Sequence, residues 1–395
     1  MCADRIILHL SLIDGVGPIT VKKILALKQS GFDLKNLYQL KCVDLTSLFG
    51  LSAKIASKLY AGLQDKNELD QELALIEKHN CKFISVANEQ YPQLLAHIYA
   101  PPPVLYFKGG DILHHTKKIA VVGARKAHGY GEKAIEKIVP ELVQKEWVIV
   151  SGGAIGADTM AHRSTLRAQG KTIAVLGSGL LKPYPFSNRR MFDEIVDKGG
   201  ALVSSFPLLA EAKPGNFPAR NRIIAGLSLG CVVVQAAQKS GACITARCAL
   251  DEGREVFAVP GPVDDELSVG CHALIRQGAV LTACADDILT ELSQYSENNT
   301  LPCAAESTSG ERQKQNKIFE TNQLTSFAKP DDTNADNQDD TSVENLIVKC
   351  CKTPCSFDDI AVAVQVDLGQ LHELLFNMQL AGKIQQNFAG MWEKV

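Results

Sequence analysis

The fold is decided by the stretches Lys118–Gly123 (KIAVVG), Trp147–Ser151 (WVIVS) and Thr172–Gly177 (TIAVLG). Each is a short apolar run that ends in Gly or Ser, a pattern typical of buried strands in a parallel sheet. Helical patterns follow the first two runs, over Gly131–Val143 and Gly156–Ala168. This alternation predicts an α/β fold with a doubly wound, extended Rossmann-like sheet.

Further apolar runs enlarge the predicted sheet: Ala201–Ser204 (ALVS), Cys231–Gln235 (CVVVQ) and Val256–Val259 (VFAV). We expect the Rossmann-like domain to occupy residues 66–295. Ligands of such sheets bind beyond the carboxyl ends of the strands. The segments that follow the strands are therefore the first candidates for a site.

Residues 1–65 precede this domain and read as short helices. A glycine turn at Gly15 and Gly17 leads into ITVKKILALKQ, and a weaker copy, FGLSAKIASKLYAGL, covers Phe49–Leu63. The pattern resembles helix-hairpin-helix units of a small SAM-like domain, in which backbone amides of the turn contact a phosphate. A plain turn between helices is the slightly favoured alternative, because Lys22 and Lys23 are the only nearby cations.

Two further regions follow the sheet. Residues 296–342 are polar and carry nine acidic and four basic residues, so a disordered acidic linker is expected. Residues 343–395 suggest a winged-helix domain, with three helices followed by a hairpin. The helix predicted at Asp367–Ala381 would be the recognition helix, and it holds no Lys or Arg. This favours contact with protein, or weak contact with DNA. The predicted elements are Val343–Lys349, Phe357–Val364 (capped by Ser356), Asp367–Ala381, Lys383–Gln386 and Met391–Lys394.

Composition narrows the class of protein. The 395 residues are 46% hydrophobic without an apolar run of membrane-spanning length, and no secretion signal is read at the start. The twelve cysteines lack CxxC spacing, which indicates reduced thiols in a cytoplasmic protein and no metal site. The whole chain has a formal net charge of −3. Without the acidic linker, the remaining residues carry a net charge of +2. Any affinity for nucleic acid must therefore come from a local basic patch.

Known catalytic and cofactor motifs are missing from the sequence. Gly170-Lys171-Thr172 matches the end of a P-loop, but Thr165 stands where the first glycine is needed. Lys182 occupies the third glycine position of a dinucleotide fingerprint that begins at Gly177. Neither HExxH nor GxSxG occurs. We therefore expect no cofactor and no catalytic residue.

The segments after four strands nevertheless share a chemistry. They combine glycines, which let a ligand approach the backbone, with guanidinium groups and an aromatic ring suited to phosphates and stacked bases. A lone arginine after a strand is more often a surface ion-pair partner, but four such segments at one sheet edge favour a binding site. The candidate residues are Gly123, Arg125, Lys126, Ser151, Gly152, Asn216, Phe217, Arg220, Asn221, Arg222, Ser240 and Gly241.

The stretch from Lys117 to Ala283 resembles the DNA-processing protein A family, also called Smf. The resemblance rests on ordered motifs: VGARKAHGYG, SGGAIGADTMAHR, KTIAVLGSGL, YPFSNR, FPARNRIIAGLS, SGACITARCALDEGREVFAVPG and LIRQGA. It implies a protein that binds single-stranded DNA taken up in natural transformation, protects it and helps load the RecA recombinase. It also implies a homodimer through the Rossmann-like domain, and no catalytic activity.

The same resemblance places Arg125 at a phosphate-binding turn. It places Ser151 and Gly152, together with the Phe217–Arg222 segment, around the DNA. The chain departs from the family pattern at five positions, where the family usually carries an arginine, two acids, a serine and an asparagine. These positions are Ile155, Ser205, Gln235, Ala242 and Cys271. The departures weaken any acid–base chemistry at the expected pocket edge, whereas a phosphate pocket loses little.

Two other functions compete with DNA binding. Related Rossmann-like folds hydrolyse nucleotides or sugar phosphates, but that chemistry needs a carboxylate at the phosphate site, and Ser205 and Gln235 are neutral. A protein-binding scaffold is the second alternative, suggested by the winged helix. We expect single-stranded DNA binding to prevail, because the guanidinium groups and Phe217 fit it best.

Overall fold

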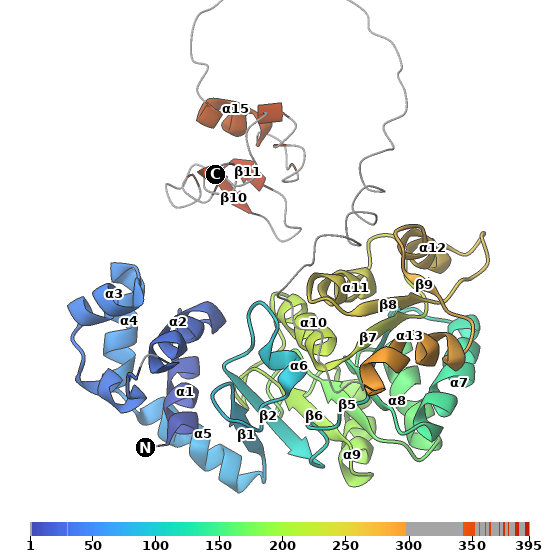
Figure 1. The fold of residues 1–395 in the computed structure, drawn as a ribbon, viewed down its shortest axis with the longest axis horizontal. Coiled ribbons are helices and arrows are strands. Elements are labelled where there is room, and N and C mark those ends of the chain that lie inside the picture. The colour runs from blue at the N-terminus through green and yellow to red at the C-terminus, as the bar shows by residue number, and fades with distance from the viewer. Residues whose placement is uncertain are drawn as a thin grey trace, which may run out of the picture. The chain divides into compact units, whose positions relative to one another are not determined.

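The computed structural model describes residues 2–29, 31–297 and 343–351, and beyond these 355, 360, 363–364, 371, 374–375, 378, 384–386 and 392–394. The described residues fall into two compact units, one up to residue 297 and one from residue 343 onward. No helix in the described ranges is long and apolar enough to cross a bilayer. Figure 1 shows the elements of both units.

A nine-stranded sheet forms the centre of the first unit, in the order β1-β2-β6-β5-β4-β3-β7-β8-β9 (Figure 1). The strands from β6 to β9 in this order run parallel, and the apolar runs predict all of them except the edge strand β9. β1 and β2 extend one edge with antiparallel pairing that the sequence did not indicate. The bounds are β1 Lys82–Ser85, β2 Val104–Gly109, β3 Lys118–Val122, β4 Val148–Ser151, β5 Thr172–Val175, β6 Ala201–Ser204, β7 Gly230–Val233, β8 Glu255–Ala258 and β9 Val280–Leu281.

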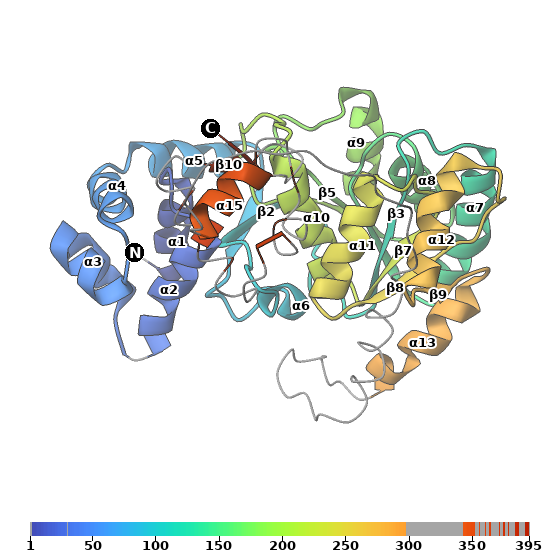
Figure 2. The same ribbon diagram turned by 90° about the horizontal axis from the view of Figure 1, so that it is seen from above.

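Helices cover both faces of the sheet, as Figure 2 shows from above. Apolar side chains from alternate strand positions pack against α6, α10, α11 and α12 on one face. The other face packs against α7, α8, α9 and α13. The bounds are α6 Gln93–Ala96, α7 Gly129–Gln144, α8 Ala157–Arg167, η2 Phe186–Asn188, α9 Arg189–Asp197, α10 Asn216–Leu227, α11 Gly241–Asp251, η3 Glu266–Ser268, α12 Val269–Arg276 and α13 Ala285–Glu297. The last helix therefore ends two residues beyond the predicted boundary at 295.

The N-terminal region is helical, and its core continues into that of the sheet. α1 packs on β1 and β2, and the backbone amide of Leu208 donates to Glu72 in α5. Gly15 has the left-handed φ that the predicted glycine turn requires. The two candidate cations are engaged within the chain, since Lys22 donates to the Tyr99 carbonyl and Lys23 to that of Gly50. The bounds are α1 Ala3–Leu12, α2 Pro18–Gln29, η1 Leu34–Gln39, α3 Cys42–Phe49, α4 Ala53–Gln64 and α5 Asn67–Lys78.

The C-terminal unit contains α15, Val343–Cys350, and an antiparallel pair, β10 Ile384–Gln386 with β11 Trp392–Lys394. These elements match the first predicted helix and the predicted hairpin. Most of the two other predicted helices and nearly all of the acidic linker lie outside the described residues. The winged-helix assignment therefore stays a prediction.

Candidate nucleic-acid interface

The segments that follow β3, β4, β5 and β6 meet at the carboxyl edge of the parallel strands. They enclose a recess of about 40 Å³. Four of the sequence candidates lie in its wall, from three different segments: Arg125, Gly152, Phe217 and Arg220. The remaining lining residues are Ala154, Ile155, Gly177, Tyr184 and Pro185.

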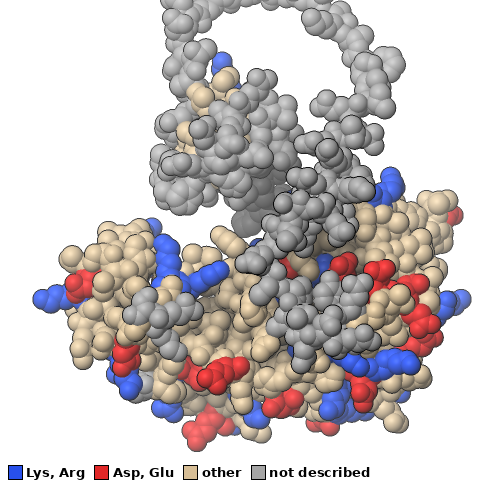
Figure 3. All heavy atoms as spheres, viewed as in Figure 1, with Lys and Arg blue, Asp and Glu red and all other residues tan. Residues whose placement is uncertain are grey.

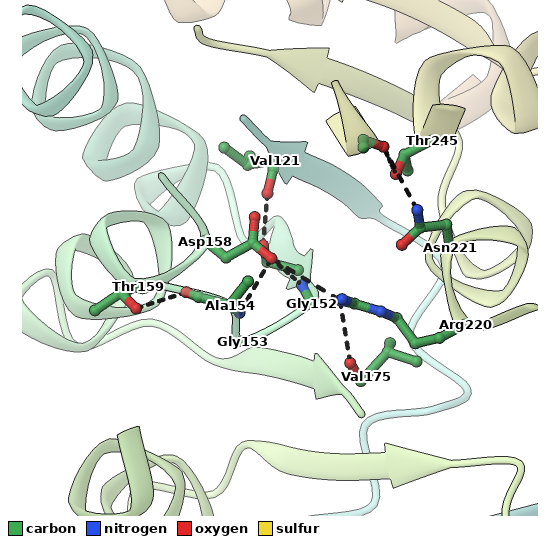
Figure 4. A network of polar contacts seen from close by, with 12 residues as sticks. Val121, Gly152, Gly153, Ala154, Asp158, Thr159, Val175, Arg220, Asn221 and Thr245 are labelled. Carbon is green, nitrogen blue, oxygen red and sulfur yellow. Dashed lines mark hydrogen bonds and ion pairs between the residues drawn. The ribbon is translucent and has the colours of Figure 1, made fainter. Parts of the chain in front are cut away.

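Arg220 is a buried cation in the wall of this recess. It lies in α10, and its side chain is 7% exposed. Its Nη1 lies 3.5 Å from the Val175 carbonyl oxygen and 3.9 Å from Asp158 Oδ2, as Figure 4 shows. Its Nε–H is buried and has no hydrogen-bond partner among the described residues. An unpaired buried donor on a charged group is costly, so an anionic ligand would be stabilised here.

Asp158 is the counter-ion of Arg220, and sequence reasoning missed it. Its Oδ2 accepts hydrogen bonds from the amides of Gly152, at 3.1 Å, and Ala154, at 3.2 Å (Figure 4). Burial raises the pKa of the Asp158 carboxyl, opposed by the Arg220 charge and by these amides. Asp158 therefore shapes the glycine turn and holds Arg220, and the Gly152 amide is directed at Asp158 and not at a ligand.

An aromatic ring joins the two guanidinium groups of the recess. The guanidinium carbons of Arg125 and Arg220 each lie 5.8 Å from the centre of the half-buried Phe217 ring. Tyr184 lies against the same ring, with 6.1 Å between ring centres. The ring therefore has one exposed cation, Arg125, and one buried cation, Arg220, beside it.

Gly152 is required by the close approach of the arginine. A Cβ at this position would lie 1.3 Å from Arg220 Nη1 and 2.7 Å from Asp158 Oδ2.

Two other candidates position the recess without lining it. The Ser151 hydroxyl donates to the Val121 carbonyl on the neighbouring strand, and Gly123 packs against Ala157. These two residues therefore hold the turns in place.

The candidate segment that begins at Asn216 forms the first turns of α10. Residues two apart on a helix point in different directions. Arg222 accordingly turns away from the recess and lies 3.8 Å from Glu252. Asn216 ties the start of α10 to the Gly177 carbonyl.

The other candidates lie around the recess and outside its wall. Asn221 is buried, and its amide reaches the Gly241 carbonyl at 3.5 Å, beside Thr245 (Figure 4). Ser240 caps α11 by accepting from the Cys243 amide. Lys126 is exposed next to Arg125. Basic and acidic side chains are interspersed over the face of the molecule that Figure 3 shows.

Comparison with known proteins gives the family. The family model described as DNA recombination-mediator protein A matches residues 82–293, which is more than half of the chain. The chain belongs to the DNA-processing protein A (Smf) family. Protein Smf of a Synechocystis strain is 33% identical over 392 residues, which cover 95% of each chain. DNA processing protein DprA of Streptococcus pneumoniae is 40% identical over 285 residues, 69% of this chain and 98% of the relative.

A solved structure supports the family fold. The X-ray structure of DNA processing protein A from S. pneumoniae is 36% identical to this chain, with a TM-score of 0.65. The match covers 73% of this chain and 98% of that one. The mixed α/β architecture with its nine-stranded sheet is thus the architecture of the family.

The departures from the family pattern are distributed unevenly around the site. In the described part of the chain, only Ile155 among them lines the recess, and its side chain is 56% exposed. Gln235 instead accepts from the His128 amide and donates to Asp265. Ala242 and Cys271 are buried in the core. We expected the changes at Ser205, Gln235 and Ala242 to lie at the pocket edge, but none of these three residues lines the recess.

Proposed function

We propose that this chain binds single-stranded DNA at the recess between Arg125, Phe217 and Arg220. The observation that carries the proposal is the buried Arg220 guanidinium, whose Nε–H has no partner within the described ranges. A phosphate would supply the missing acceptor through a charge-assisted hydrogen bond. Arg125 adds a second cation at the rim.

The size of the recess explains why an unpaired strand is the favoured ligand. Its volume of about 40 Å³ is a few times the roughly 10–15 Å³ that one water molecule needs. Phosphate oxygens can enter such a space, whereas a base must lie across its mouth. Phe217 offers its ring there, and stacking on it requires a base that is not already stacked in a duplex.

A hydrolase function is disfavoured because the carboxylate nearest the recess, that of Asp158, is buried and already engaged. Ser205 and Gln235 supply no carboxylate to the proposed phosphate site, but Asp158 lies behind the recess. Its Oδ2 is engaged by two backbone amides and by Arg220, and its side chain is 9% exposed. A general base must reach the proton that it removes. Asp158 therefore has a structural role.

The family resemblance extends the proposal to the cellular role. We infer that the protein acts in the cytoplasm during natural transformation, protects incoming single strands and helps load the RecA recombinase. A homodimer through the Rossmann-like domain belongs to the same inference. Gel filtration with light scattering tests the dimer, and strand exchange by RecA on protein-coated DNA tests the loading.

Fluorescence anisotropy tests the binding itself. Labelled oligothymidine and a duplex of equal length are titrated at about 50 and about 200 mM salt. The single strand should bind more tightly, and its affinity should fall at the higher salt because phosphate contacts release counterions. A preference for duplex, or an affinity that ignores salt, would overturn the proposal.

A further inference from the structure

A wide groove continues from the recess. It has a volume of about 1300 Å³ and shares Tyr184 and Phe217 with the wall of the recess. Its lining runs along the segment between β5 and α9 and includes Phe186 and Arg189. A strand held at the recess can therefore continue past these two rings into the groove.

Two aromatic side chains project from this segment. Phe186 is 74% exposed and Tyr184 52%, although exposing a large ring to water is unfavourable. The Arg189 guanidinium carbon lies 5.9 Å from the Phe186 ring centre. This pair repeats the combination of ring and guanidinium that Phe217 forms with Arg125 and Arg220.

Two buried residues anchor the segment, one between the exposed rings of Tyr184 and Phe186 and one after them. Pro185 is buried, and so is Asn188. The Asn188 amide donates to the Gly153 carbonyl at 2.9 Å and to the Thr159 hydroxyl at 2.8 Å. These bonds tie the segment to the same turn that forms the recess. The segment that carries the rings is thus anchored before a ligand arrives, which lowers the entropic cost of binding.

The charges of the groove indicate which part of a ligand it contacts. Lys108, Lys182 and Arg189 are offset by Asp193, Asp197 and Glu211 in the lining. One pair is direct, with 3.8 Å between Lys182 Nζ and Glu211 Oε1. A groove without net charge attracts a phosphate chain weakly, whereas its exposed rings can stack on bases. The contacts here are therefore with bases.

We propose that Phe186, supported by Arg189, is a second stacking site for a base of the strand whose backbone is held at the recess. This inference rests on the proposed function and extends it along the groove. A short oligonucleotide fills the recess alone. A longer one also reaches Phe186 and binds more tightly for that reason.

A length series separates the two sites. The full chain is titrated with oligothymidines from about four to about sixteen nucleotides, by competition against a labelled long oligothymidine. Phe186→Ala should leave the shortest oligonucleotide unaffected and weaken the longest about tenfold, within the range known for one stacked base. Phe217→Ala should weaken every length.

Two further variants serve as controls. Tyr99 is also exposed, at 71%, and also carries a cation, with Lys22 Nζ 5.6 Å from its ring centre, but it lies outside the groove. Tyr99→Ala should therefore behave as wild type at all lengths. Phe186→Tyr keeps a ring and should keep the length-dependent gain.

The outcomes distinguish the second site from the first. If Phe186→Ala matches wild type at every length while Phe217→Ala weakens binding, the second site is overturned and the proposed function stands. If wild type and Phe217→Ala bind all lengths equally, the recess itself is wrong. Equal weakening of the shortest and longest oligonucleotides by Phe186→Ala would also contradict a separate second site.

Discussion

Asp158 and Arg220 form a buried ion pair beneath the proposed DNA site, with Oδ2 and Nη1 3.9 Å apart and less than a tenth of either side chain exposed. The pair, drawn in Figure 4, joins the first turn of α8 to α10. These two helices pack on opposite faces of the sheet. Its separation is longer than that of a direct hydrogen bond. Arg220 is thus held in place while its Nε–H keeps the capacity for a ligand.

Removal of the Asp158 charge should destabilise the fold. Asp158→Asn leaves Arg220 buried without its counter-ion, and breaking a buried pair in this way costs about 3 kcal/mol of unfolding free energy. Urea denaturation measures the loss. The double variant Asp158→Asn with Arg220→Met should recover part of it, because no uncompensated charge remains. A single variant as stable as wild type would show that the pair contributes nothing.

Arg125 and Arg222 should differ in their effect on DNA. Arg125 lines the recess, whereas Arg222 lies 3.8 Å from Glu252 and turns away from it. Arg125→Ala should weaken oligothymidine binding about tenfold and flatten its dependence on salt by about one phosphate contact. Arg222→Ala, the matched control, should change affinity less than about twofold. Equal losses in the two variants would count against the recess as the site.

Ile155 offers a gain of function. It occupies the position of a family arginine, lines the recess and is 56% exposed. Ile155→Arg should strengthen binding about fivefold at low salt and steepen the salt dependence, because a third cation reaches the phosphate. Ile155→Gln controls for length and polarity without charge and should show neither effect. Unchanged titrations for the arginine variant would separate this position from the DNA.

His162 should make stability depend on pH. The Thr172 hydroxyl donates to the Ile149 carbonyl, so it accepts from His162 Nδ1, and His162 Nε2 is buried without a partner in the described ranges. Burial, and secondarily the Arg220 charge, lowers the pKa of His162 from 6.5 to about 3. Between these values the unfolded chain binds a proton that the folded chain does not. The unfolding free energy should therefore fall as pH decreases below 6.5.

The expected contribution of His162 is up to about 1.4 kcal/mol per pH unit. Urea denaturation at a series of pH values measures the slope. His162→Asn keeps a donor toward Thr172 but cannot titrate, so its slope should be smaller by that amount. Identical slopes would mean that His162 is protonated in the folded protein.

The sequence predicted the parallel strands other than β9, because they are buried and appear as continuous apolar runs. β9 was missed, since it has two residues and is only partly buried. The antiparallel edge strands were missed, since Lys82–Ser85 is short and mixed in character and Val104–Gly109 follows three prolines. Of the site, Arg125, Gly152, Phe217 and Arg220 were predicted and lie together. The sequence feature that identified these residues was their location in segments that follow predicted strands.

The residues that were misplaced or missed depend on direction and on contacts distant in sequence. Arg220 and Arg222 looked equivalent as a loop, and recognising α10 from Asn216 would have separated them. Asp158 looked like an ordinary acid in the first turn of a helix, where such residues are common. Tyr184 and Phe217 are distant in the sequence, and only the fold brings their rings together. No local pattern shows that contact.

A crystal structure with a short oligothymidine bound tests the central claim most directly. We predict a phosphate oxygen within hydrogen-bonding distance of the Arg220 guanidinium, Arg125 turned toward the same phosphate, and a thymine ring stacked on Phe217. An ordered oligonucleotide bound elsewhere on the chain, with the recess between these three residues empty, would contradict the account.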